Sequence, residues 1–128
     1  MENRAVKVLL IEDDLSLLEM YSLKFREEGL ALTTATDGLT GLELAKKELP
    51  AVILLDIMMP KMDGFAVLTE LKKDEQTKKI PVLMLSNLGQ ENDIEKGKKL
   101  GANDYIVKAS MTPTQVVDKT KSYLGSSA

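Results

Sequence analysis

An apolar segment that ends in a single carboxylate constrains this chain more than any other feature. Residues 51–55 (Ala-Val-Ile-Leu-Leu) lead directly to Asp56, and the turn-forming residues Pro60, Asp63 and Gly64 follow. A short apolar run bounded by turn signals is typical of a strand that is buried on both faces. In an open α/β sheet, ligands bind at the carboxyl ends of the parallel strands. We therefore expect Asp56 to lie at the functional edge of such a sheet.

The rest of the chain repeats the order of a strand followed by a helix. Apolar runs predict strands at residues 6–11, 31–35, 51–56, 81–85 and 105–107. Helical spacing and helix-ending residues predict helices at 15–28, 39–49, 65–71, 91–100 and 113–124. Such repeats with short connections imply a parallel sheet with helices on both faces. We predict an α/β fold with a doubly wound five-stranded parallel sheet, as one domain at residues 1–125 with a tail at 126–128.

Local signals indicate the ends and the apolar faces of these helices. Asp14 is typical of a residue that caps the start of a helix, and Gly29 of one that follows its end. Thr112 and Gln115 form the pattern of a capping box, whereas Gly97 weakens the helix at 91–100. The expected apolar faces comprise Leu15, Leu18, Tyr21 and Phe25 in the first helix, and Leu39, Leu42 and Ala45 in the second.

The composition excludes several kinds of chemistry. The chain contains no Cys and no His, which excludes disulfides, thiolate nucleophiles, Ser-His-Asp triads and thiolate or imidazole metal ligands. Its 17 Lys and Arg against 20 Asp and Glu give a net charge of −3, so we expect no direct contact with nucleic acid. No signal peptide or membrane-spanning stretch is evident, and we expect a cytoplasmic protein.

Polar side chains stand at the ends of four of the predicted strands, which meet at one edge of the sheet. Two charges about 4 Å apart interact by roughly 4 kcal/mol at an effective dielectric constant near 20, so gathered carboxylates need a cation nearby. Oxygen ligands with open positions suit Mg²⁺, and aspartate is a known acceptor of phosphoryl groups. We interpret Asp56 as the nucleophile, Glu12 and Asp13 as metal ligands, and Ser86 and Lys108 as partners of the bound phosphoryl oxygens.

Each of these residues also has an ordinary structural explanation. The acids after the first strand are compatible with a loop that caps the next helix, and Asp56 alone with a turn. A single Ser or Lys at a strand end is usually solvated, and Tyr105 is typical of a half-buried core aromatic. The joint occurrence of these residues at successive strand ends favours the functional interpretation.

The chain resembles the receiver domain of bacterial two-component response regulators, the CheY-like family, over almost its whole length. The motifs that carry the resemblance are Leu10-Ile-Glu12-Asp13-Asp14, Leu55-Asp56-Ile-Met58-Met-Pro60 with Asp63-Gly64, Leu85-Ser86-Asn87, and Gly101-Ala-Asn-Asp-Tyr105-Ile-Val-Lys108. The resemblance implies the strand order 2-1-3-4-5, which is that of flavodoxin and CheY.

The resemblance further implies phosphorylation of Asp56 by a sensor histidine kinase or a histidine phosphotransfer protein. Mg²⁺ would be held by Asp13, Asp56 and the backbone carbonyl of Met58, with Glu12 acting through water. Ser86 would move toward the phosphoryl group and Tyr105 would turn inward. This motion reshapes the face of the fourth helix, fifth strand and fifth helix, which would bind a downstream protein. A receiver of this kind promotes its own phosphorylation and dephosphorylation without being an enzyme for another substrate.

Three positions qualify the resemblance. The family usually has a cis proline after the lysine, but Ala109 follows Lys108 here, and a non-proline cis bond costs about 2.5–4 kcal/mol. We expect a small shift of this loop, with Lys108 still within reach of the acids. Met58 and Leu88 lie two residues beyond Asp56 and Ser86, where family members tune the access of water. Because both are bulky and apolar, we predict slow loss of the phosphoryl group.

The sequence is also compatible with two other functions. A pseudo-receiver would keep the fold as a docking module without being phosphorylated, and the replacement of proline by Ala109 fits that function. A Mg²⁺-dependent hydrolase with an aspartate nucleophile would need a second acid nearby, which the segment from Asp56 to Met58 does not supply. We expect a stand-alone receiver, since the sequence stops after the fifth predicted helix.

Overall fold

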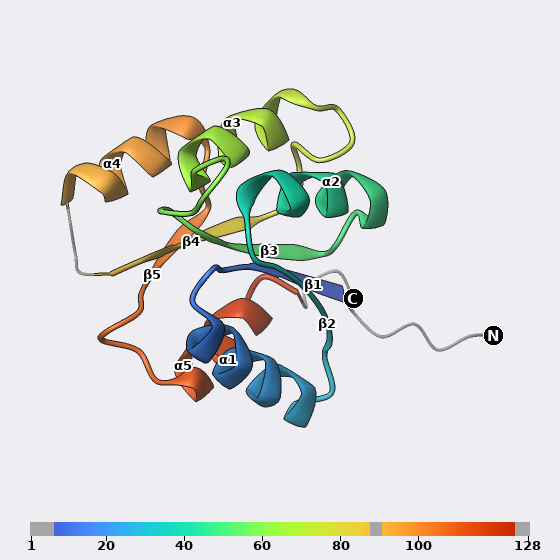
Figure 1. The fold of residues 1–128 in the computed structure, drawn as a ribbon, viewed down its shortest axis with the longest axis vertical. Coiled ribbons are helices and arrows are strands. Elements are labelled where there is room, and N and C mark those ends of the chain that lie inside the picture. Colours follow the sequence, from blue (N-terminus) through green and yellow to red (C-terminus); the bar gives the residue numbers. More distant parts are fainter. Residues whose placement is uncertain (1–6, 88–90, 125–128) are drawn as a thin grey trace.

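Five parallel strands form the centre of the molecule in the computed structural model, which describes residues 7–87 and 91–124. Strands and helices alternate along the whole of this part of the chain (Figure 1). Their bounds are β1 (Lys7–Ile11), α1 (Leu15–Glu27), β2 (Ala31–Ala35), α2 (Gly38–Glu48), β3 (Val52–Asp56), α3 (Gly64–Lys73), β4 (Val82–Ser86), α4 (Glu91–Leu100), β5 (Asp104–Val107) and α5 (Pro113–Lys121). The predicted doubly wound α/β fold is confirmed.

The strand order is β2-β1-β3-β4-β5, as the family resemblance implied. The apolar strand β3 lies at the centre, where Leu54 pairs with Leu10 of β1 and with Leu83 of β4. Every residue of β3 is buried, because both faces of a parallel sheet are covered by helices. The strand that ends in Asp56 is therefore fixed on both sides and both faces.

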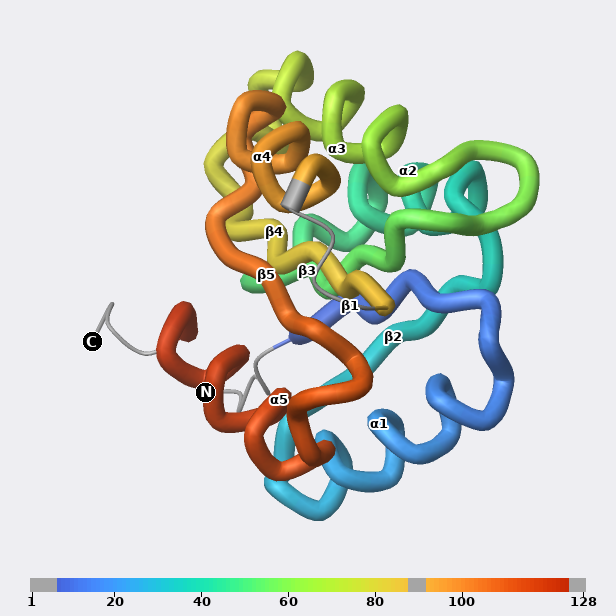
Figure 2. Tube along the Cα trace, turned by 90° about the vertical axis from the view of Figure 1, so that its left-hand side faces the viewer, coloured from blue at the N-terminus to red at the C-terminus, as the bar shows by residue number. Residues whose placement is uncertain are grey.

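Helices cover the two faces of the sheet unequally. Helices α1 and α5 pack on one face, and α2, α3 and α4 pack on the other (Figures 1 and 2). Because successive side chains of a strand point to opposite faces, Val8 and Leu10 of β1 join the core beneath α1 and α5, whereas Leu9 and Ile11 join the core beneath α2 and α3. None of the helices within the described ranges is long and apolar enough to cross a membrane.

The predicted helix caps are confirmed. The Asp14 side chain accepts hydrogen bonds from the backbone N–H groups of the first turn of α1, and Gly29 follows the helix with a φ of +79°. Both hydrogen bonds of the capping box between Thr112 and Gln115 are present at the start of α5. These helix ends depend on hydrogen bonds and backbone conformations of residues that are close in the sequence, which explains why the sequence predicts them.

Two predicted apolar faces are partly wrong. Leu15 and Leu39 are 65% and 47% exposed, although both were expected to be buried. Leu15 opens α1 at the carboxyl edge of the sheet, where the strands that would cover it have ended. In α2 the buried residues lie on one face of the helix, and Leu39 lies just outside this face. The buried residues are Gly38, Gly41, Leu42 and Ala45.

Some predicted boundaries also differ from the structure. Helix α5 ends at Lys121 and the chain continues as a turn through residues 122–124, so the predicted helix was too long. Helix α3 extends to Lys73, beyond the predicted end at residue 71, and β5 begins at Asp104. The predicted tail at 126–128 lies outside the described residues.

Candidate functional site

The carboxyl edge of the sheet brings the predicted site residues together from four strands. Glu12 and Asp13 follow β1, Asp56 is the last residue of β3, Ser86 is the last residue of β4, and Lys108 follows β5. Since β1, β3, β4 and β5 are successive neighbours in the sheet, these side chains meet at one edge. The backbone N–H of Lys108 donates to the carbonyl of Ser86 at 2.8 Å, which extends the pairing of β5 with β4 and holds the lysine at this edge.

Lys108 forms ion pairs with two of the acids. Its Nζ lies 2.8 Å from Glu12 Oε1 and 3.0 Å from Asp56 Oδ1. Glu12 and Asp56 are 0% and 5% exposed, whereas Asp13 is exposed to solvent. One ligand oxygen from each of the three acids lies within 4.8 Å of the other two. The site therefore has a buried ionic interior and one solvent-facing carboxylate at its mouth.

Burial and neighbouring charges shift the pKa values of Asp56 and Lys108. Burial, together with the negative charge of Glu12, raises the pKa of Asp56 to about 7, although Lys108 opposes the shift. Burial alone would lower the pKa of Lys108, but its hydrogen bond to Glu12 and the charge of Asp56 outweigh this effect and raise it. Lys108 thus remains a cation, and its single charge does not fully compensate the two buried carboxylates.

The donor set fits a hard divalent cation. All three acids offer oxygen, and among the described residues the buried Glu12 Oε1 has no hydrogen-bonding contact besides Lys108. Oxygen-only sites with few carboxylates suit Mg²⁺, which retains water molecules in its remaining positions. Asp13 and Asp56 present the carboxylates that such an ion would need, and the loop that contains Met58 begins directly after Asp56.

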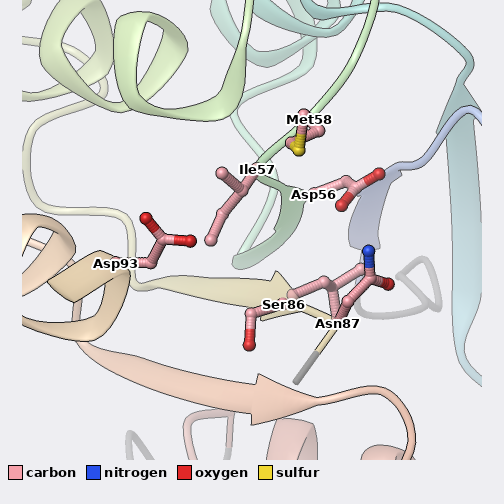
Figure 3. A pocket seen from close by; sticks show the side chains of 7 residues that line it. Asp56, Ile57, Met58, Ser86, Asn87 and Asp93 are labelled. Atoms are coloured by element: carbon pink, nitrogen blue, oxygen red, sulfur yellow. The ribbon is translucent and has the colours of Figure 1, made fainter. Parts of the chain in front are cut away.

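Ser86 lies at this edge, and its side chain has no partner among the residues that the structure describes. Its side chain is buried and its Oγ makes no hydrogen bond within residues 7–87 and 91–124, which is unusual for a buried hydroxyl. In Figure 3 the hydroxyl points away from the Asp56 carboxylate, so the two groups are not in contact. The hollow that separates them has a volume of about 50 Å³ and is lined by Asp56, Ile57, Met58, Leu85, Ser86, Asn87 and Asp93.

Asp93 also belongs to this region, although the sequence does not predict it. It stands in the first turns of α4 and lines the same hollow as Asp56 (Figure 3). Its backbone carbonyl accepts a hydrogen bond from the hydroxyl of Tyr105, which is half-buried against α4. Burial and the charge of Asp93 raise the pKa of Tyr105. No motif marks Asp93, because its role depends on how α4 packs beside β5.

Gly97 explains how Tyr105 can lie against α4. A Cβ at Gly97 would lie 3.1 Å from Tyr105 Cζ and 3.2 Å from Cε2, which is closer than side chains normally approach. From the sequence alone, this glycine is expected only to weaken the helix. In the structure it provides the space for the tyrosine ring.

The loop after β5 has a trans peptide bond between Lys108 and Ala109, since the described residues contain no cis peptide bond. Lys108 nevertheless reaches both Glu12 and Asp56, which confirms the expectation that the lysine stays within reach. Of the two positions predicted to tune the access of water, Met58 is 73% exposed, and Leu88 lies outside the described residues.

A doubly wound sheet whose carboxyl edge carries three acids and a lysine is the arrangement of a signalling receiver domain. Comparison with known proteins identifies the family. Residues 8–121 match the response regulator receiver domain, and the chain belongs to this family. It is 42% identical over 102 residues to the DNA-binding dual master transcriptional regulator RpaA of Synechocystis sp., covering 80% of this chain and 42% of that protein. The chain therefore spans less than half the length of this relative.

Solved structures agree with the family assignment. The chemotaxis response regulator CheY4 of Vibrio cholerae has a TM-score of 0.87 at 30% identity, covering 94% of this chain and 100% of that one. The receiver domain of sensor histidine kinase PA1611 from Pseudomonas aeruginosa has a TM-score of 0.87 at 24% identity, covering 96% and 100%, and shows the same fold. That protein was crystallised with a magnesium ion coordinated in its active site cleft.

Proposed function

We propose that Asp56 accepts a phosphoryl group from a phosphohistidine of a sensor histidine kinase or a histidine phosphotransfer protein. A carboxylate oxygen of Asp56 attacks the phosphorus, the P–N bond breaks, and the electron pair goes to the imidazole nitrogen, which takes up a proton from water. The observation that carries this proposal is the buried ionic cluster, in which Lys108 reaches Asp56 and Glu12 at the carboxyl edge of the sheet.

Asp13, Asp56 and the backbone carbonyl of Met58 would hold Mg²⁺, with Glu12 acting through a water molecule. When bound, the ion neutralises negative charge on the phosphoryl oxygens. The three acids support this assignment, because their oxygens lie within 4.8 Å of one another. Burial and the negative charge of Glu12 raise the pKa of Asp56 to about 7, and a dication beside the carboxylate opposes both effects, so Asp56 stays ionised as a nucleophile.

Lys108 and Ser86 would contact the oxygens of the phosphoryl group on Asp56. Lys108 Nζ already lies 3.0 Å from Asp56 Oδ1, so it can stabilise charge on a group attached there. The Ser86 hydroxyl has no hydrogen-bond partner in the described part of the chain, and a turn of this side chain toward the phosphoryl group would give it one. Tyr105 would then turn inward into the vacated space and release the Asp93 carbonyl of α4.

The output would pass to a downstream protein through the face formed by α4, β5 and α5. We propose that this chain acts in the cytoplasm through protein contacts rather than by holding nucleic acid itself, in keeping with its net charge of −3. It would also promote loss of its own phosphoryl group, when water attacks the phosphorus and releases inorganic phosphate. The bulky side chains of Met58 and Leu88 would make this loss slow.

The decisive experiment is the intact mass of the protein after incubation with a small-molecule phosphodonor, with and without Mg²⁺. We expect a Mg²⁺-dependent gain of one phosphoryl group in the wild type and none in Asp56→Asn. Asp37→Asn is the matched control, because Asp37 caps α2 and asparagine also caps helices well, so phosphorylation should persist.

The same experiment separates the alternatives. No gain in mass by the wild type would favour a pseudo-receiver that only docks. Rapid turnover of the donor without a stable adduct would favour a hydrolase with an aspartate nucleophile.

A further inference from the structure

Met58 is the most exposed large apolar side chain among the described residues. It is 73% exposed, whereas Met20 is 42% exposed and Met84 is fully buried. Met59, Met62 and Met111 are half-buried. A thioether that is this accessible meets dissolved oxidants more readily than any of the other described methionines.

The side chain of Met58 also stands next to the reactive carboxylate. It lines the hollow that contains Asp56 and Ser86, and it lines a second hollow of about 290 Å³ together with Met59 and Phe65. Figure 3 shows its sulfur beside Asp56. A chemical change at this sulfur therefore alters the surroundings of Asp56 directly.

We propose that Met58 is a site of reversible oxidation by peroxides, and that its oxidation shortens the lifetime of the phosphoryl group on Asp56. The second half of this proposal rests on the proposed function. In the reaction a sulfur lone pair attacks one oxygen of hydrogen peroxide, the O–O bond breaks and an S–O bond forms. The hydroxide that departs and the proton of the transferred oxygen give water, so sulfur loses the two electrons that the peroxide gains. Methionine sulfoxide reductases reverse this oxidation.

Oxidation to the sulfoxide makes the side chain beside Asp56 more polar. A thioether is apolar and a weak acceptor, whereas a sulfoxide is polar and accepts hydrogen bonds strongly. An acceptor two residues beyond Asp56 holds water close to the phosphoryl group, and such a water can attack the phosphorus. We expect dephosphorylation to become faster by roughly two- to tenfold, which is the effect of one ordinary hydrogen bond to the attacking water.

The first test measures oxidation in the absence of any phosphodonor. The whole chain is treated with limiting hydrogen peroxide, and the oxygen atoms gained are located by peptide mapping. We expect Met58 to be oxidised before Met20, and Met84 last. Met58→Leu removes the fastest phase, whereas the control Met20→Leu retains it. If Met20 or a half-buried methionine reacts as fast as Met58, the proposal is overturned.

The second test measures the phosphoryl lifetime before and after oxidation. Peroxide should shorten the lifetime in the wild type and leave that of Met58→Leu unchanged, and Met58→Gln should resemble the oxidised wild type. Equal lifetimes of oxidised and reduced wild type would refute the regulatory half of the proposal. A wild type that gains no phosphoryl group would instead refute the proposed function, and the oxidation order from the first test would stand on its own.

Discussion

At the residue scale, the acids around Asp56 are held together against their own repulsion. Two buried carboxylates share one ammonium group, and the exposed Asp13 adds a third negative charge at the mouth. Burial of Asp56 and the negative charge of Glu12 raise the pKa of Asp56, so this carboxyl group tends to hold a proton. Because a pKa shift is a difference in stability between two protonation states, it has a measurable consequence for folding.

We expect Asp56→Asn to stabilise the fold at neutral and alkaline pH when no divalent cation is present. The folded-state pKa of about 7 lies above the unfolded value of 3.8. The stabilising contribution of the protonated form is therefore complete below pH 3.8 and is lost as the pH rises through 7. A shift of this size corresponds to roughly 4 kcal/mol, and asparagine avoids the loss because it has no proton to release.

Urea unfolding at a series of pH values between 4 and 8, in the presence of a chelator, measures this difference. The free energy of unfolding of the wild type should fall relative to that of Asp56→Asn as the pH rises, and the difference should level off above pH 7. Asp37→Asn controls for the loss of another, half-buried acid at the same edge. Parallel curves for the wild type and Asp56→Asn would mean that Asp56 is ionised without cost.

At the element scale, the contact between α4 and β5 depends on Gly97 and Tyr105. In most helices alanine is more favourable than glycine by about 1 kcal/mol. Here the added methyl group would meet the tyrosine ring, whose hydroxyl donates to the Asp93 carbonyl. We expect Gly97→Ala to destabilise the wild type, and the same change to stabilise the fold in a Tyr105→Leu background, where the ring is absent.

A double-mutant cycle by chemical unfolding measures the coupling between these two residues. The change of sign in the effect of Gly97→Ala distinguishes a collision with Tyr105 from ordinary helix propensity. Stabilisation by Gly97→Ala in both backgrounds would show that the ring moves aside without cost.

The ends and faces of individual helices and strands illustrate what the sequence could and could not predict. Helix caps at Asp14 and Thr112 and the strand that ends in Asp56 follow from short-range patterns, and the structure contains them. The exposure of Leu15 depends on where the sheet ends, and the part played by Asp93 depends on how α4 lies beside β5. Both depend on how the elements pack together, and the spacing of apolar residues within a single helix does not predict this packing.

In the candidate site, too, the sequence predicts some features and not others. Sequence spacing places Glu12, Asp56 and Lys108 at one edge as soon as the strands are assumed to be parallel. The direction in which the Ser86 hydroxyl points is set by the rotamer and the packing at the end of β4, and no spacing rule predicts it.

At the scale of the whole molecule, charge is separated along the direction of the strands. Basic residues occupy the last turn of every described helix, and aspartates cap the starts of α1, α2 and α3. Helices in this fold run opposite to the strands, so their starts share the edge that carries the site. This arrangement complements the helix dipoles, but it also adds Asp14, Asp37 and Asp63 to an edge that is already acidic.

Because the acidic edge belongs to one cooperative fold, a cation that binds there should stabilise the whole molecule. We expect Mg²⁺ at about 100 times its dissociation constant to raise the free energy of unfolding by about 2.7 kcal/mol. In a domain of this size that corresponds to a rise of roughly 10 °C in Tm. The rise should be larger at pH 8 than at pH 6, since protons compete with the ion for Asp56, whose pKa is about 7.

Thermal unfolding in Mg²⁺ and in NaCl of equal ionic strength separates specific binding from screening. NaCl weakens the repulsion among all the acids of this edge, so it should raise the Tm of the wild type and Asp13→Asn alike. Mg²⁺ should add a further rise in the wild type that Asp13→Asn lacks, because Asp13 is the solvent-facing acid of the three. If the two salts act equally on both proteins, the acidic edge attracts cations only as a diffuse cloud, and phosphorylation of Asp56 would then have to proceed without a bound metal ion.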